Sequence, residues 1–86
     1  MIVIPTKNFE KKLSKSSNTV KIKFKERIRI FMSEAHNIIL NNHKLHGKYT
    51  GYRSINITGN YRLIFEEIKV DTVRLVDINT HPELYG

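Results

Sequence analysis

The strongest constraint on the fold is a pair of strand-like segments in the second half of the chain, joined by a tight turn. The turn is Thr58-Gly59-Asn60, and the apolar segment Tyr61 to Phe65 follows it. Two strand-like segments separated by a glycine-containing turn are typical of a β-hairpin. The hairpin carries Arg53 and Arg62 on neighbouring strands, so the stretch from His43 to Glu66 holds most of the chemically informative side chains.

The length and composition predict a single small domain over residues 1–86. A chain of 86 residues has room for one modest core, and its 40% hydrophobic residues are enough to form it. Cysteine is absent, which excludes disulfides and cysteine-based metal sites and fits a reducing cytosol. No stretch approaches the roughly 20 apolar residues of a membrane span, and the start MIVIPTKNF lacks the pattern of a signal peptide. We therefore expect a cytoplasmic protein with no membrane partner.

The positive charge is concentrated in the first third of the chain. Residues 1–30 contain nine lysines and arginines against two glutamates, which accounts for the whole net charge of +7. A one-sided basic surface attracts polyanions, because neutralising phosphates releases condensed counterions. A solvated helix face is the plainer explanation. Binding to a membrane surface is a further alternative, but the apolar residues are needed for a core.

The N-terminal residues predict a strand followed by a short amphipathic helix. Met1 to Ile4 is an apolar segment ended by proline, and Thr6 is a good N-cap for the residues that follow. From Lys7 to Ser16, Phe9 and Leu13 lie four positions apart and so share one face of a helix.

The segment from Thr19 to Asn42 is compatible with two structures. Its first part, VKIKFKERIRI, alternates apolar and basic residues with the period of a strand. Apolar residues also form a stripe at helical spacing, namely Val20, Phe24, Ile28, Phe31, Ala35, Ile38 and Ile39. Strands rarely exceed about ten residues, so we predict one long helix, with His43 beginning a loop. Ile22 and Ile30 fall off this stripe, and either widen the buried face or meet a partner protein.

The remaining residues predict a last strand and complete the fold class. A turn near Val70-Asp71 precedes a segment in which Val73 and Leu75 alternate with their neighbours. The short links between strands favour antiparallel pairing. We predict an α+β fold in which two N-terminal helices pack on a small antiparallel sheet of three to four strands.

Three motifs in order, HKLHGKYTGYRS, GNYRLIFE and the terminal NTHPELYG, resemble toxins of the RelE/ParE superfamily. The resemblance is strongest to the YafQ-like branch of type II toxin–antitoxin systems and covers the second half of the chain most closely. It implies a RelE-like fold and a ribosome-dependent mRNA endonuclease that needs no metal or other cofactor. It also implies a cognate antitoxin, and contacts with ribosomal RNA and mRNA.

Metal-free RNA cleavage requires a base, a cation beside the phosphate and an acid for the leaving oxygen. Histidine titrates near neutral pH and can fill either proton-transfer role, whereas arginine offers a planar fork for phosphate. The resemblance implies that His43 is the base, Arg62 the phosphate-binding cation and His81 the acid. The expected substrate-binding residues are Arg53, Asn56, Asn60, Tyr85, Lys44, His46 and Lys48, with Tyr85 holding or stacking the substrate base.

The chain departs from the YafQ-like pattern at two positions. Asn56 and Asn60 stand where the branch usually has histidine and aspartate, and an amide cannot transfer a proton at neutral pH. We therefore assign acid–base chemistry to His43 and His81, and reduced activity is one expected consequence.

Each of these residues also has a purely structural explanation. His43 could cap the C-terminus of the long helix, where a partly positive ring is favourable, and Arg62 could pair with Glu66. A zinc site built from His43, His46 and His81 is disfavoured because the first two lie in a predicted loop. At the level of the whole protein, the alternatives are a ParE-like inhibitor of DNA gyrase, which binds without catalysis, and a plain RNA-binding domain.

Overall fold

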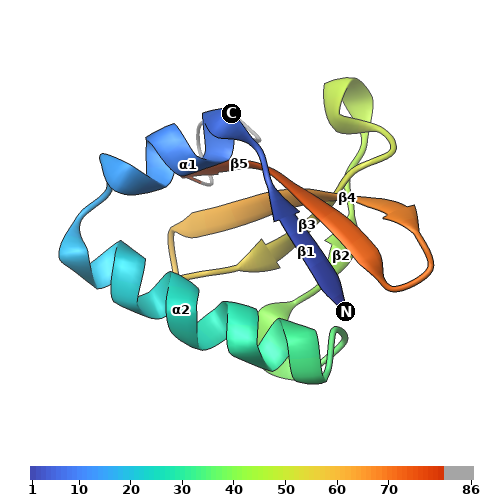
Figure 1. Ribbon diagram of the computed structural model, residues 1–86, viewed down its shortest axis with the longest axis horizontal. Coiled ribbons are helices and arrows are strands. Elements are labelled where there is room, and N and C mark those ends of the chain that lie inside the picture. The colour runs from blue at the N-terminus through green and yellow to red at the C-terminus, as the bar shows by residue number, and fades with distance from the viewer. Residues whose placement is uncertain (81–86) are drawn as a thin grey trace.

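The computed structural model describes residues 1–80, in which two helices pack on one face of a five-stranded sheet (Figure 1). The strands are β1 (Ile2–Pro5), β2 (His43–Lys44), β3 (Arg53–Asn56), β4 (Tyr61–Lys69) and β5 (Thr72–Thr80). The helices are α1 (Lys7–Ser14) and α2 (Asn18–Ser33), followed by two short 3-10 helices, η1 (Ile38–Leu40) and η2 (Gly47–Tyr49). The predicted α+β class with two N-terminal helices is confirmed.

The sheet has five strands in the order β1-β5-β4-β3-β2, which is more than the three to four expected. It is also mixed, because β1 runs parallel to β5 while the other pairs are antiparallel. The N-terminal ammonium lies 3.2 Å from the Asp71 carboxylate, and the Ile2 N–H donates to the Asp71 carbonyl. The first strand therefore covers an edge of β5 that would otherwise expose unpaired backbone groups. His43 lies in β2 and not in the predicted loop.

The cap at Thr6 anchors α1 to the sheet. The Thr6 hydroxyl accepts a hydrogen bond from the Phe9 N–H at 3.2 Å and donates to the Leu75 carbonyl of β5 at 2.9 Å. Phe9 and Leu13 face inward as predicted, and Phe9 packs on Phe24 of α2 with ring centroids 5.2 Å apart. One threonine thus begins the helix and fixes its position on β5.

The second helix is shorter than predicted, since it ends at Ser33 and not at Asn42. Side-chain hydrogen bonds in the following turn replace those of a continuing helix. The side-chain Oδ1 of Asn37 accepts a hydrogen bond from the Ile39 N–H, and the side-chain amide of Asn42 donates to the Ala35 carbonyl at 2.9 Å. Ala35 still packs against the core from this turn. The prediction that Ile38 and Ile39 continue the buried stripe is wrong, because they are 95% and 47% exposed once the helix has ended.

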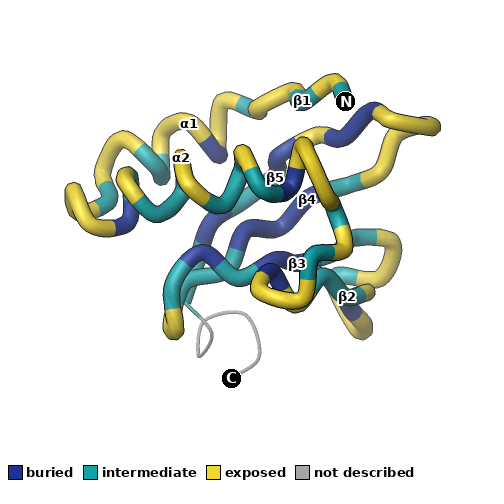
Figure 2. The backbone as a smooth tube through the Cα atoms, turned by 90° about the horizontal axis from the view of Figure 1, so that it is seen from below, coloured by how far each residue is buried: buried dark blue, intermediate teal, exposed yellow. Residues whose placement is uncertain are grey.

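The main core lies between the helices and the sheet, and a second, smaller cluster lies on the opposite sheet face. Figure 2 shows that the buried segments are concentrated in the central strands, whereas the outer sides of both helices are exposed. In the main core, the Phe31 ring packs against the Phe65 ring at 4.9 Å in an edge-on arrangement. The second cluster comprises Leu45 and Ile64 with Tyr49, Tyr52 and Val76.

The two isoleucines that fall off the helical stripe have different environments. Ile30 packs against the main core, so it widens the buried face of α2. Ile22 is 64% exposed, so it does not. Within residues 1–80, neither helix is long and apolar enough to cross a membrane.

Replacing Phe31 with alanine should lower the free energy of unfolding by about 3–5 kcal/mol, because it removes a ring that is 1% exposed and leaves a cavity. Urea denaturation followed by circular dichroism measures the change. Ile22→Ala, at an exposed position of the same helix, is the matched control and should change the free energy of unfolding by no more than about 0.5 kcal/mol. Equal losses in the two variants would contradict this description of the core.

Candidate active site

The sheet face opposite the helices carries two rows of side chains that include His43 and Arg62. Arg62 lies directly opposite Asn56 of β3 and Asn79 of β5, and His43 lies opposite Ser54 of β3. Directly paired residues on neighbouring strands project from the same face of a sheet. In β4, Leu63 and Phe65 enter the helix-side core, whereas Ile64 packs in the second cluster. Both rows therefore lie on the face that the helices leave open.

His43 and Arg62 lie on the same sheet face, on strands separated by β3. Because β3 lies between them, they are two strand spacings apart across the sheet. His43 pairs with Ser54 and Arg62 pairs with Asn56, two residues further along β3. Standard strand geometry places the Cα atoms of His43 and Arg62 roughly 12 Å apart. Side chains of this length can approach a phosphodiester that lies between them.

The His43 ring is oriented by the backbone two residues before it. Its Nδ1 lies 2.8 Å from the carbonyl oxygen of Asn41, a residue in the left-handed conformation at φ 49°. A carbonyl can only accept, so Nδ1 donates the hydrogen and the neutral ring carries its lone pair on Nε2. This is the tautomer that a general base requires. The alternative role as a cap of a long helix does not apply, because α2 ends at Ser33.

The Arg62 guanidinium is held by carbonyl groups of the β3–β4 turn. Its Nη1 donates to the carbonyl oxygens of Thr58, Gly59 and Tyr61 at 3.1–3.3 Å. Within residues 1–80 no carboxylate pairs with it, and Glu66 instead lies 3.7 Å from Arg74. These contacts orient the guanidinium toward the β3–β4 turn without neutralising its charge.

On this face, two residues have a buried side-chain oxygen that lacks a hydrogen-bond partner among the described residues. They are Asn56, through its carbonyl oxygen, and Ser54, through its hydroxyl. A buried polar atom without a partner costs about 1–3 kcal/mol. Arg27 of α2 carries two further atoms of this kind, Nε and Nη1, away from this face. Ser54 was not among the predicted site residues. The structure draws attention to it by its unpartnered hydroxyl and by its position opposite His43.

Arg53 projects from the other face of the sheet. Its cross-strand partner is Phe65, which lies in the helix-side core. Its Nε donates to the Asn42 side-chain oxygen at 2.8 Å. The alternation in Arg53-Ser54-Ile55 could have revealed this placement, because Ile55 is a core residue and Arg53 shares its face.

The structure groups Arg53 with two other predicted substrate-binding residues at the end of β2 and β3. Together with Lys44 and His46 it lines a pocket of about 320 Å³. The same pocket is lined by Leu45, Thr50, Gly51, Tyr52 and Glu67. The predicted site is therefore divided into an open-face group around Arg62 and a separate basic pocket.

The remaining predicted residues lie apart from these two groups. Lys48 is exposed on η2, with its ammonium 5.3 Å from the centre of the Tyr49 ring, and Asn60 is exposed in the β3–β4 turn. His81 and Tyr85 lie outside the described residues. In the part of the chain that the structure describes, no three histidine, aspartate or glutamate side chains are placed to hold a metal ion.

Comparison with known proteins identifies the family. Residues 2–86 match the family model described as the bacterial toxin of type II toxin–antitoxin system, YafQ. A comparison with curated protein sequences gave no significant match.

Solved structures show the same fold in related toxins. Escherichia coli YafQ is 19% identical, with a TM-score of 0.76 over 98% of this chain and 97% of that one. A YoeB/ParE toxin from Agrobacterium tumefaciens is 16% identical, with a TM-score of 0.75 over 94% and 99% of the two chains. The RelB–RelE antitoxin–toxin complex of Methanococcus jannaschii contains a chain that is 25% identical, with a TM-score of 0.73 over 95% and 94%. The chain belongs to the YafQ family of bacterial toxins, within the RelE superfamily of type II toxin–antitoxin systems.

Proposed function

We propose that this toxin is a ribosome-dependent endoribonuclease that cleaves mRNA without a metal ion. The observation that carries the proposal is the placement of His43 and Arg62 on one sheet face, with the His43 Nδ1 held by the Asn41 carbonyl. Attack by a ribose 2′-hydroxyl needs a base for its proton and a cation for the phosphate, and these two residues supply one of each on the same sheet face.

In the proposed reaction, Nε2 of His43 takes the proton from the 2′-hydroxyl, and the 2′-oxygen forms a bond to the adjacent phosphorus. Arg62 stabilises the charge that builds on the phosphate oxygens. The bond from phosphorus to the 5′-oxygen breaks as His81 gives that oxygen a proton. The products carry a 2′,3′-cyclic phosphate and a 5′-hydroxyl.

The other predicted residues are assigned to binding and not to proton transfer. Asn56 and Asn60 orient phosphate or hydroxyl groups on the Arg62 side, and Tyr85 stacks on the substrate base. Arg53 faces away from Arg62, so it cannot contact the phosphate that is cleaved. The pocket that Arg53 shares with Lys44 and His46 therefore holds a flanking part of the message. Lys48 adds a phosphate contact beside this pocket.

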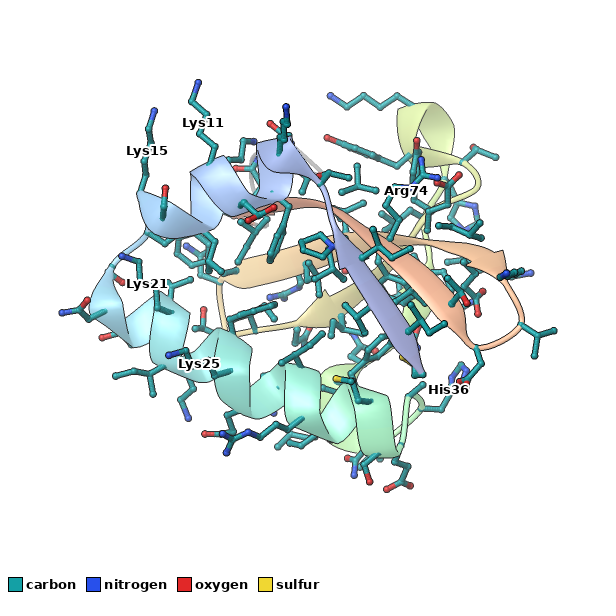
Figure 3. The ribbon with its side chains drawn as sticks, in the orientation of Figure 1. Lys11, Lys15, Lys21, Lys25, His36 and Arg74 are labelled. Atoms are coloured by element: carbon teal, nitrogen blue, oxygen red, sulfur yellow. The ribbon has the colours of Figure 1, made fainter. Side chains whose placement is uncertain are left out.

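The partners follow from the same proposal. The basic residues of the first 30 positions attract ribosomal RNA in the cytoplasm, where the toxin meets translated message. A cognate antitoxin protein neutralises the toxin, a role supported by the related RelB–RelE complex. Lys11 and Lys15 project from α1, and Lys21 and Lys25 project from α2 (Figure 3). Arg62 lies on the sheet face opposite these helices, so docking through these lysines and catalysis would use different surfaces.

Purified toxin should cut a defined mRNA at codon-related positions only when ribosomes are translating it, because the ribosome presents the message to the toxin. Primer extension on a translated template and on the same template without ribosomes makes this comparison. Cuts of equal strength without ribosomes would contradict the dependence. Growth arrest with intact mRNA and damaged DNA would favour inhibition of gyrase.

Arg62→Ala should lower the rate of cleavage by about 10²–10³-fold, since it removes the cation that stabilises the transition state. Single-turnover cleavage of ribosome-bound mRNA measures the rate. Arg74→Ala is the matched control, because Arg74 is a sheet arginine that pairs with Glu66 and has no assigned role. If both variants kept the native rate, Arg62 would have no part in the mechanism.

His43→Ala should lower the same rate by about 10²–10⁴-fold, because the ring acts as the base. The circular dichroism spectrum should stay unchanged, because the ring is only partly buried. His36→Ala, at an exposed position near the end of α2, serves as the control and should cleave normally. An active His43→Ala protein would exclude this ring as the base.

A further inference from the structure

The basic pocket at the end of β2 and β3 contains a carboxylate that the proposed reaction does not use. This carboxylate belongs to Glu67 of β4. Phe65, two residues earlier in β4, pairs with Arg53, so Glu67 and Arg53 project from the same sheet face as diagonal neighbours. Lys44 of β2 pairs with Arg53 from the other side. Two cations and one carboxylate from three neighbouring strands therefore share a cavity of about 320 Å³.

These three charged side chains do not neutralise one another. Within residues 1–80, neither Lys44 nor Arg53 lies within ion-pair distance of a carboxylate, and Glu67 lies within that distance of no cation. Arg53 donates through Nε to the Asn42 side chain at 2.8 Å, which fixes its guanidinium and leaves the two Nη groups for a ligand. Glu67 is exposed, so its carboxylate is also accessible to a ligand.

The remaining wall of the basic pocket suits a flat ring. Leu45 is buried and Tyr52 is half-buried, and both belong to the second apolar cluster. Beside Tyr52, Gly51 has a φ of 95°, and a Cβ built there would meet nothing within 4 Å, so this side of the pocket is open. Nucleic-acid bases stack on tyrosine rings in many RNA-binding proteins. A volume at the lower end of the range for small-ligand pockets, roughly 300–1,000 Å³, suits a single nucleotide.

We propose that the basic pocket binds one guanine nucleotide of the mRNA. Lys44 and Arg53 contact its phosphate, and Tyr52 packs against the base. Glu67 accepts two hydrogen bonds from the edge of the base, one from N1–H and one from the N2 amino group. This assignment rests on the proposed function, because the nucleotide belongs to the message that the toxin cleaves.

The carboxylate is the group that selects guanine. A carboxylate only accepts hydrogen bonds, so its best partner is a pair of donors side by side. Guanine has such a pair on its Watson–Crick edge. Adenine and cytosine place an acceptor nitrogen beside a single amino group, and uracil places one N–H between two carbonyl oxygens. A pocket for phosphate alone would gain nothing from Glu67, because its charge repels a phosphate.

The basic pocket lies close to the proposed base along the chain. Lys44 directly follows His43 in β2, and β2 is a two-residue strand at the edge of the sheet. Consecutive Cα atoms are about 3.8 Å apart, so a message held at His43 passes only this short edge to reach Lys44. Glu67 would then read a base near the cleaved linkage and take no part in the cleavage itself.

Nucleotide binding tests the proposal on the full-length toxin without any cleavage. Guanosine 5′-monophosphate should shift the backbone amide NMR signals of Lys44, Tyr52, Arg53 and Glu67. Inosine 5′-monophosphate lacks only the N2 amino group and should bind about tenfold more weakly, as should adenosine 5′-monophosphate. Equal affinities for the three nucleotides would overturn the proposal, since phosphate alone would explain the binding. Shifts confined to other residues would overturn it as well.

Single substitutions separate base reading from phosphate binding. Glu67→Gln should bring the affinities for guanosine and adenosine monophosphates to within about twofold of each other, because the amide replaces one acceptor with a donor. Arg53→Ala should weaken the binding of both nucleotides by the same factor. Glu66→Gln is the matched control, because Glu66 precedes Glu67 on the opposite sheet face and pairs with Arg74. Full retention of the guanosine preference by Glu67→Gln would contradict the role of this carboxylate.

Cleavage of translated templates separates this proposal from the proposed function. Templates that differ by one base at each position beside the cut should show a preference of about fivefold for guanine over adenine at one position, and Glu67→Gln should lose that preference. A toxin that cuts equally well with any base at every flanking position would keep the proposed function and lose the guanine site. A toxin that binds guanosine monophosphate in the pocket but never cuts translated mRNA would keep the nucleotide site and lose the proposed function.

Discussion

The two-sided central strand β4 is the constraint on which both the core and the candidate site depend. Its alternate residues leave in opposite directions, with Leu63 and Phe65 entering the helix-side core and Arg62 and Ile64 facing the open side. A shift of pairing by one residue would exchange these sets, burying a guanidinium and exposing a phenylalanine. The burial of Phe65 against Phe31 therefore fixes the direction of Arg62.

Local signals were sufficient to predict the elements whose hydrogen bonds are close in sequence. The Thr6 cap, the amphipathic α1 and the β3–β4 hairpin each depend on residues only a few positions apart. The end of α2 was missed because it depends on side-chain hydrogen bonds made by Asn37 and Asn42. No proline or glycine lies near Ser33 to mark the end of the helix in the sequence. The parallel pairing of β1 with β5 joins residues about 70 positions apart, and no local pattern predicts it.

The strand pairing separates the predicted site residues in a way that their types alone do not indicate. His43 and Arg62 share a sheet face, but Arg53 does not, and the strand alternation that separates them was present in the sequence. Ser54 and the Asn41 carbonyl were missed because their importance comes from geometry: one lies opposite His43, and the other sets its tautomer. Small polar residues and backbone groups leave no distinctive signal in a single sequence.

The distribution of polar groups explains why so small a domain can be both folded and chemically equipped. The hydrophobic cluster between the helices and the sheet is aliphatic and aromatic, whereas the side-chain oxygens of Ser54 and Asn56, which lack a partner among residues 1–80, lie on the opposite face. Arg27 of α2 also has two buried nitrogens without a hydrogen-bond partner in that part of the chain. The cost of the two oxygens, about 1–3 kcal/mol each, is a substantial part of the 5–15 kcal/mol that stabilises a typical domain. Ile64, Leu45 and the tyrosines around them offset part of it by forming a second apolar cluster on that face. Since the helices pack on the other face of the sheet, Arg62 remains partly exposed on this one. The same separation leaves the outer sides of α1 and α2 unconstrained by packing, so they can carry the excess of positive charge without destabilising either the core or the site.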